Sequence, residues 1–104
     1  MLEENDLLIT FQESEMKEQD PPARAVALSY DQDRDQAPVV VAKGQGLIAE
    51  RIKALAAEHN IPVQENQVLI KYLMALQIYE EIPPELYQVV AEILAFIYRI
   101  DQRY

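Results

Sequence analysis

The chain has 104 residues, half of them apolar, and a formal net charge of −9 at pH 7. This length suits one domain with a modest core, and no second domain is expected. The lack of cysteine excludes disulfides, thiolate zinc sites and cysteine nucleophiles, and a single histidine excludes a His-rich metal site, so we expect neither metal nor cofactor.

The negative charge is concentrated in the first third, where residues 1–36 hold ten acids and three bases, whereas residues 37–104 hold eight acids and six bases. A net negative chain with scattered bases argues against nucleic acid as a partner. The acidic start is the opposite of a signal peptide, and no apolar run reaches the roughly 18 residues of a membrane span. We therefore expect a cytoplasmic protein without a membrane span.

Residues 1–19 combine a short apolar cluster around Leu7–Phe11 with a long polar run. This composition predicts an acidic, weakly ordered N-terminal arm. Asp20-Pro21-Pro22 then interrupts the chain, because two prolines fix φ and remove two backbone donors. We place the start of the domain at residue 20 and its end at residue 104.

Two strands are predicted next. Residues 25–30 are mostly apolar, residues 31–36 form an acidic turn, and residues 38–42 are a β-branched run of the kind found in a strand buried on both faces. The two runs are expected to pair as neighbours across the acidic turn.

Three helices and a short strand follow. A first helix after the Gly44–Gly46 turn has one apolar face, the segment 61–65 predicts a strand, and a second helix begins at the N-cap Asn66 and continues to about Tyr79. A long amphipathic helix begins near Pro84. The apolar positions assigned to the buried faces are, in order, Ile48, Ile52, Leu55, Ala56 and His59; Leu69, Tyr72, Leu73 and Leu76; and Leu86, Val89, Val90, Ile93, Leu94, Ile97 and Ile100. The pattern predicts an α/β fold with a small central mixed β-sheet wrapped by helices and ending in a long C-terminal helix.

Candidate chemical motifs are weak. The Gly44–Gly46 pair lacks the third glycine of a dinucleotide fingerprint and the lysine of a P-loop, so a tight strand-to-helix turn is favoured over a small-ligand site. His59 has no second histidine or cysteine as a partner, and the pairs Glu80-Glu81 and Asp33/Asp35 do not match a calcium loop. The tyrosines in the last two helices serve core packing or a partner surface.

The segment from Asp20 to Asp31 resembles the Asn-Pro-Thr-His segment and following strand of the FlhB family's cytoplasmic domain. Three further landmarks occur in the same order, at residues 37–44, 61–66 and 82–95. Four ordered landmarks make the resemblance specific. It implies a cytoplasmic domain of the flagellar (type III) export gate, which helps to switch export between substrate classes and normally follows a membrane domain of four helices.

This sequence departs from the family at the self-cleavage loop. The family's asparagine attacks its own main-chain carbonyl and releases the following proline as a new N-terminus. The four motif positions here are Asp20, Pro21, Pro22 and Ala23, so the amide nucleophile and the imidazole are both missing. The apolar strand that precedes the motif in the family is replaced by Glu18-Gln19, which puts the first strand of the sheet in question and leaves open whether Leu7–Phe11 takes its place.

The resulting expectation is a non-enzymatic, non-cleaving interaction module of the flagellar or a related type III export apparatus. Its partners would be protein components or substrates of that apparatus, with peripheral association at the export gate and Arg24, Lys43 and Tyr87 as candidate partner-binding residues. Two alternatives are residual self-processing at the acid-labile Asp20–Pro21 bond and small-ligand binding at the Gly44–Gly46 turn.

Overall fold

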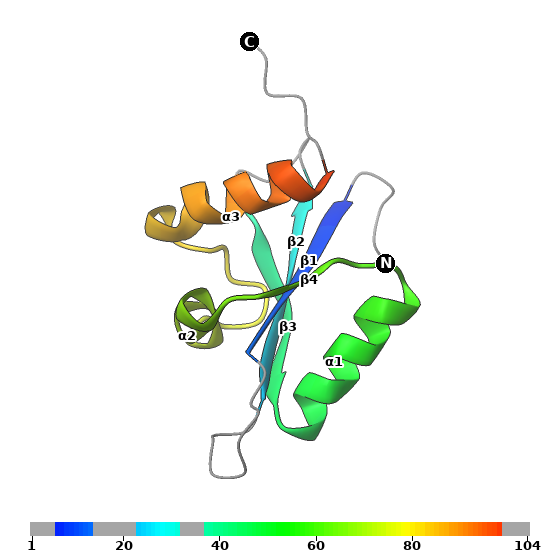
Figure 1. Ribbon diagram of the computed structural model, residues 1–104. Coiled ribbons are helices and arrows are strands. Elements are labelled where there is room, and N and C mark those ends of the chain that lie inside the picture. Colours follow the sequence, from blue (N-terminus) through cyan, green and yellow to red (C-terminus); the bar gives the residue numbers. More distant parts are fainter. Residues whose placement is uncertain (1–5, 14–22, 32–36, 99–104) are drawn as a thin grey trace.

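A computed structural model describes residues 6–13, 23–31 and 37–98 (Figure 1). The strands are β1 (Asp6–Glu13), β2 (Arg24–Asp31), β3 (Val39–Gln45) and β4 (Val63–Glu65). The helices are α1 (Leu47–Glu58), α2 (Gln67–Met74) and α3 (Pro84–Tyr98).

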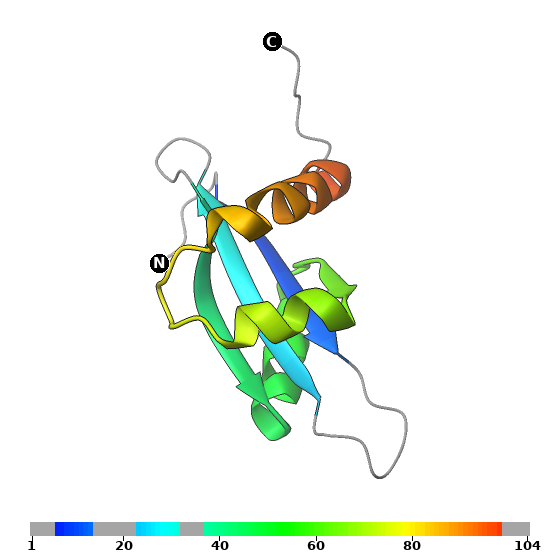
Figure 2. The ribbon, with the colours of Figure 1, turned by 90° about the vertical axis from the view of Figure 1, so that its left-hand side faces the viewer.

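The strands form one mixed sheet in the order β3-β2-β1-β4. β2 pairs antiparallel with both β1 and β3, and β4 pairs parallel with β1. Helices α2 and α3 cover one face of the sheet and α1 lies on the other (Figures 1 and 2). The α/β class, the mixed sheet wrapped by helices and the final long helix are thus confirmed.

The main core lies between the sheet and the α2/α3 layer. Strand alternation sends Ile9 and Phe11 of β1 to the core, and both side chains are fully buried. The buried members of this cluster are Ile9, Phe11, Val26, Leu28, Ala37, Val40, Leu69, Ile70, Leu73, Ile82, Val90 and Leu94. On the opposite face α1 buries only the small side chains Ala49 and Ala56, so it packs closely against the sheet.

The prediction of a weakly ordered arm is wrong for Asp6–Glu13, because this segment is an inner strand of the sheet. β1 pairs with β2 over its whole length, from Asp6↔Asp31 to Glu13↔Arg24, and its other edge pairs with β4. The apolar cluster of residues 7–11 is therefore core rather than arm. The remaining arm residues, 1–5 and 14–19, lie outside the described residues.

The predictions for β2, β3 and β4 are confirmed within a few residues, and β2 and β3 do pair. The prediction that the run 38–42 is buried on both faces is wrong, because β3 is an edge strand in which Val39 and Val41 are only partly buried. The segment after α2 covers part of this edge: Val40 N donates to Glu80 O (3.0 Å), and Ile82 N donates to Pro38 O (2.9 Å).

The same contacts end α2 at Met74, five residues before the predicted end at Tyr79. The chain must leave the helix to reach β3, where Tyr79 N donates to Val40 O (2.6 Å). Some predicted helix faces also differ, because Ile48, Leu55, Tyr72 and Val89 are exposed, whereas Leu69, Leu73, Val90 and Leu94 are buried as expected. Ile100 lies outside the described residues.

Candidate functional site

The loop that joins β1 to β2 carries the positions of the cleavage motif. Asp20, Pro21 and Pro22 lie outside the described residues, and Ala23 is the first described residue after the loop. The Ala23 carbonyl accepts a hydrogen bond from Gly46 N at 2.8 Å. Gly46 has φ 64°, a conformation that glycine adopts readily, and this geometry aims its amide at Ala23. The Gly44–Gly46 turn therefore joins α1 to the base of the β1–β2 loop, and the Gly46 amide is hydrogen-bonded to the Ala23 carbonyl.

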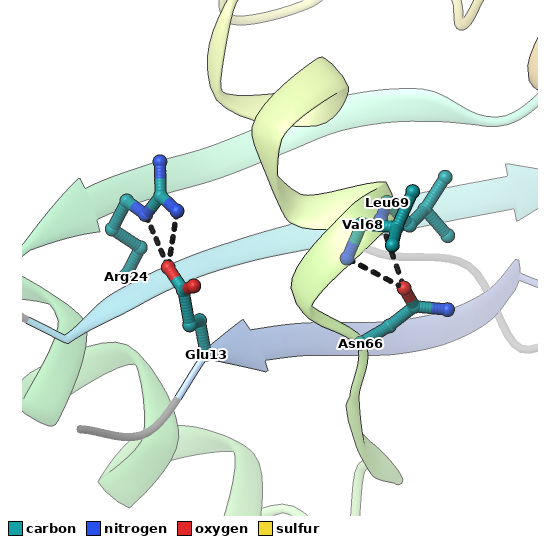
Figure 3. A network of polar contacts seen from close by, with 5 residues as sticks. All are labelled: Glu13, Arg24, Asn66, Val68 and Leu69. Carbon is teal, nitrogen blue, oxygen red and sulfur yellow. Dashed lines mark hydrogen bonds and ion pairs between the residues drawn. The ribbon is translucent and has the colours of Figure 1, made fainter. Parts of the chain in front are cut away.

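An ion pair closes the base of the same loop (Figure 3). Arg24 Nε donates to Glu13 Oε1 at 2.7 Å, and Arg24 Nη2 contacts the same oxygen. Their side chains are 23% and 11% exposed, respectively, so the charges are mostly shielded from water. Arg24 was a candidate partner-binding residue; the structure shows its guanidinium bound to Glu13, within the domain.

Asn66 connects the start of helix α2 to the end of β1. Its backbone N–H donates to Gln12 O at 3.0 Å, and its side-chain Oδ1 accepts from Val68 N (3.1 Å) and Leu69 N (2.8 Å) (Figure 3). The predicted N-cap role of Asn66 is thereby confirmed. The end of β1 is thus held by β2 on one side and by the start of α2 on the other.

Lys43, the second candidate partner-binding residue, is also used internally. Its Nζ donates to Met74 O (3.0 Å) and to Leu76 O (2.6 Å), where α2 ends. A cation satisfies unpaired carbonyls at a helix C-terminus and interacts favourably with the helix dipole. Lys43 therefore anchors the end of α2 to β3.

Tyr87, the third candidate, is half-buried and packs against the core cluster. Tyr98 joins α3 to β1, because its hydroxyl donates to Leu8 O at 2.7 Å. Tyr72 and Tyr79 are instead 59% and 78% exposed. Of these four tyrosines, two serve packing or tethering, and two present most of their surface to solvent.

An apolar groove between α2 and α3 was not anticipated from the sequence. It has a volume of about 580 Å³ and is lined by Tyr72, Leu76, Pro83, Glu85 and Leu86. The signal that could have revealed it is a second apolar stripe at a spacing of four residues, formed by Val68 and Tyr72 of α2 and by Leu76 just after it. This stripe lies beside the core-facing residues Leu69, Ile70 and Leu73.

Among the described residues, no group of three His, Asp or Glu side chains could hold a metal ion. His59 is exposed at the end of α1. In the described part of the chain no helix is both long enough and apolar enough to cross a bilayer.

Comparison with known proteins identifies the domain. The profile of the FlhB HrpN YscU SpaS family matches residues 19–97. An uncharacterized protein, YlqH, of Bacillus subtilis is 44% identical over 87 residues, covering 84% of this chain and 94% of YlqH. The flagellar biosynthetic protein FlhB of Salmonella typhimurium is 44% identical over 83 residues, covering 79% of this chain and 22% of FlhB. This chain thus spans about a fifth of the length of the FlhB proteins it matches.

Solved structures with the same fold support this relationship. The cytoplasmic domain of FlhB from Shewanella putrefaciens superposes with a TM-score of 0.73 at 27% identity, covering 86% of this chain and 68% of that chain. A substituted EscU C-terminal domain gives a TM-score of 0.72 at 25% identity, covering 92% of this chain and 81% of that chain. The chain therefore belongs to the FlhB HrpN YscU SpaS family and has the fold of the cytoplasmic domain of FlhB.

Proposed function

We propose that this chain is a non-enzymatic interaction module of the flagellar or a related type III export apparatus, and that it acts without self-cleavage. The observation that carries the proposal is the fold of the family's cytoplasmic domain combined with a changed motif. The family match begins at residue 19 and so includes the motif positions.

The residues at the motif support the absence of self-cleavage. At neutral pH an aspartate is ionised and has no amide nitrogen, so Asp20 lacks the nucleophile of the family's reaction. Ala23 occupies the position of the imidazole and has only a methyl group. The contacts on either side of the motif, Glu13–Arg24 and Ala23–Gly46, join β1 to β2 and the start of β2 to α1, as expected of a stable interaction module.

The proposed partners are protein components or substrates of the export apparatus, and the proposed location is the cytoplasmic side of the export gate. A binding role agrees with the exposed apolar side chains on the helical layer, of which Val68 and Tyr72 are 68% and 59% exposed.

Complementation tests the proposal. The chain is expressed in a strain whose FlhB lacks its cytoplasmic domain, and flagellar proteins secreted into the medium are quantified. The control is Ile70→Asp, which places a charge in the core and should abolish folding. We expect partial or full recovery of export with the unchanged chain only. A folded chain that restores no export and co-purifies with no export component would contradict the proposal.

A further inference from the structure

The groove between α2 and α3 is lined by apolar side chains with one exception. Tyr72 and Leu76 come from α2 and the residues just after it, and Pro83 and Leu86 come from the start of α3. Glu85 supplies the single carboxylate among the lining residues. Figure 2 shows the two helices lying side by side over the same face of the sheet, connected around its β3 edge.

Packing within the domain accounts for Leu76, which contacts the core cluster, but not for the other two residues of the stripe on the α2 side of this groove. α2 already buries Leu69, Ile70 and Leu73 in the core, which is the single apolar face that a surface helix needs. Val68 and Tyr72 nevertheless remain 68% and 59% exposed. Apolar residues that are contiguous, exposed and border a groove mark binding surfaces more often than scattered ones do.

The charge around the groove indicates the chemistry of its occupant. Glu85 lines the groove, and Glu80 and Glu81 are exposed on the connection that leads to it. Lys71 is the basic residue of α2, but it does not line the groove. A site with apolar walls and the carboxylate of Glu85 favours apolar anchors accompanied by positive charge.

We propose that the α2–α3 groove binds an amphipathic, basic segment of a protein partner, with large apolar side chains seated beside Tyr72 and a lysine or arginine facing Glu85. A volume of about 580 Å³ falls within the range of ligand pockets and accepts a few large side chains. A groove between two helices is also the kind of surface that receives an amphipathic helix. This inference deepens the proposed function and rests on it.

The probe for this proposal is a fluorescently labelled helical peptide of leucine and lysine, with leucine at positions i, i+3, i+4 and i+7. Its counterpart replaces every lysine by glutamate. Binding to the full chain is measured by anisotropy at low and at physiological salt. Four variants are compared, all at exposed positions so that folding is retained: Tyr72→Ser and Glu85→Gln at the groove, and Phe96→Ser and Glu92→Gln elsewhere on α3.

We expect the lysine peptide to bind and the glutamate peptide not to bind. Tyr72→Ser should weaken binding by about tenfold, as truncation of an aromatic anchor does. Glu85→Gln should weaken it by about threefold at low salt and by less at high salt. Phe96→Ser and Glu92→Gln should change the affinity by less than about twofold, since they lie outside the groove.

Three results would overturn the proposal. One is equal binding by all four variants, which would mean that the peptide is held by net charge alone. Another is that the lysine peptide and the glutamate peptide bind equally well, or that neither of them binds. The last is a dimer of the unchanged chain that Tyr72→Ser converts to monomer in sedimentation, because a second copy would then be the occupant. None of these results depends on restored export, so the groove and the proposed function can fail separately.

Discussion

The guanidinium of Arg24 donates two hydrogen bonds to Glu13 Oε1, at the last pair of the β1–β2 ladder before the loop. β1 and β2 are thus paired as far as the loop that connects them and carries the motif positions. The pair keeps the two strands in register on either side of the loop where we propose that the chain remains intact.

Loss of the Arg24 charge should destabilise the domain. Arg24→Met leaves the mostly buried Glu13 carboxylate without its cation, and we expect a loss of about 1–3 kcal/mol, since the pair retains some solvent exposure. Urea unfolding measures the change. The double variant Glu13→Gln with Arg24→Met should lose less than Arg24→Met alone. A larger loss in the double variant would show that the two side chains are not coupled.

Lys43 should contribute to stability through α2. Lys43→Met removes both hydrogen bonds to the carbonyls of Met74 and Leu76, so the free energy of unfolding should fall by about 1–2 kcal/mol. The matched control is Lys71→Met, at an exposed lysine of α2 itself, and its expected change in the free energy of unfolding is within about 0.5 kcal/mol. Equal effects of the two substitutions in thermal or urea unfolding would contradict the anchoring role.

Gly44 should tolerate no side chain. A Cβ at this position would lie 2.1 Å from Ile48 Cγ2 and 2.7 Å from Ile48 Cβ, so α1 would have to move away from β3. We expect Gly44→Ala to cost about 1–3 kcal/mol, as overpacking does. Adding Ile48→Ala should recover only part of this loss, because the Cβ contact remains. A neutral Gly44→Ala would show that α1 moves freely on the sheet.

Tyr79 should be replaceable with a gain in stability. Its φ is 73°, in the left-handed region that disfavours most side chains, and its side chain is 78% exposed. Tyr79→Asn should raise the free energy of unfolding by about 0.5–1 kcal/mol, since asparagine accepts this conformation at lower cost. The neighbouring Ile78→Asn, at a residue without positive φ, should bring no gain. If both substitutions destabilise equally, backbone strain at Tyr79 is not significant.

Much of the fold was predictable because local patterns and tertiary packing agree. The run at residues 25–30 is a strand, Asn66 is an N-cap, and Leu69, Leu73, Val90 and Leu94 are buried, as their spacing indicates. β1 was not predicted as a strand because its apolar cluster is short and flanked by acids, and because one of its two neighbours is β4, more than 50 residues away in the sequence. The early end of α2 was missed because it depends on hydrogen bonds to β3.

Less of the site was predictable. Arg24 and Lys43 were predicted as partner-binding residues, whereas the structure shows both bound within the domain. Their acceptors, Glu13 Oε1 and the carbonyls at the end of α2, are set by strand register and helix packing. The Gly44–Gly46 turn was correctly favoured as a structural connection, and its contact with Ala23 follows only from the sheet. The groove depends on how α2 and α3 are placed side by side, which no local pattern specifies.

The central claim is that this domain acts without self-cleavage, and intact mass spectrometry tests it most directly. The chain is purified, incubated for days at neutral pH, and compared with a variant that restores the family's motif through Asp20→Asn, Pro22→Thr and Ala23→His. We predict that the unchanged chain keeps its full mass of 12.0 kDa, whereas the restored variant releases a fragment that begins at Pro21. A Pro21 fragment from the unchanged chain would contradict the account.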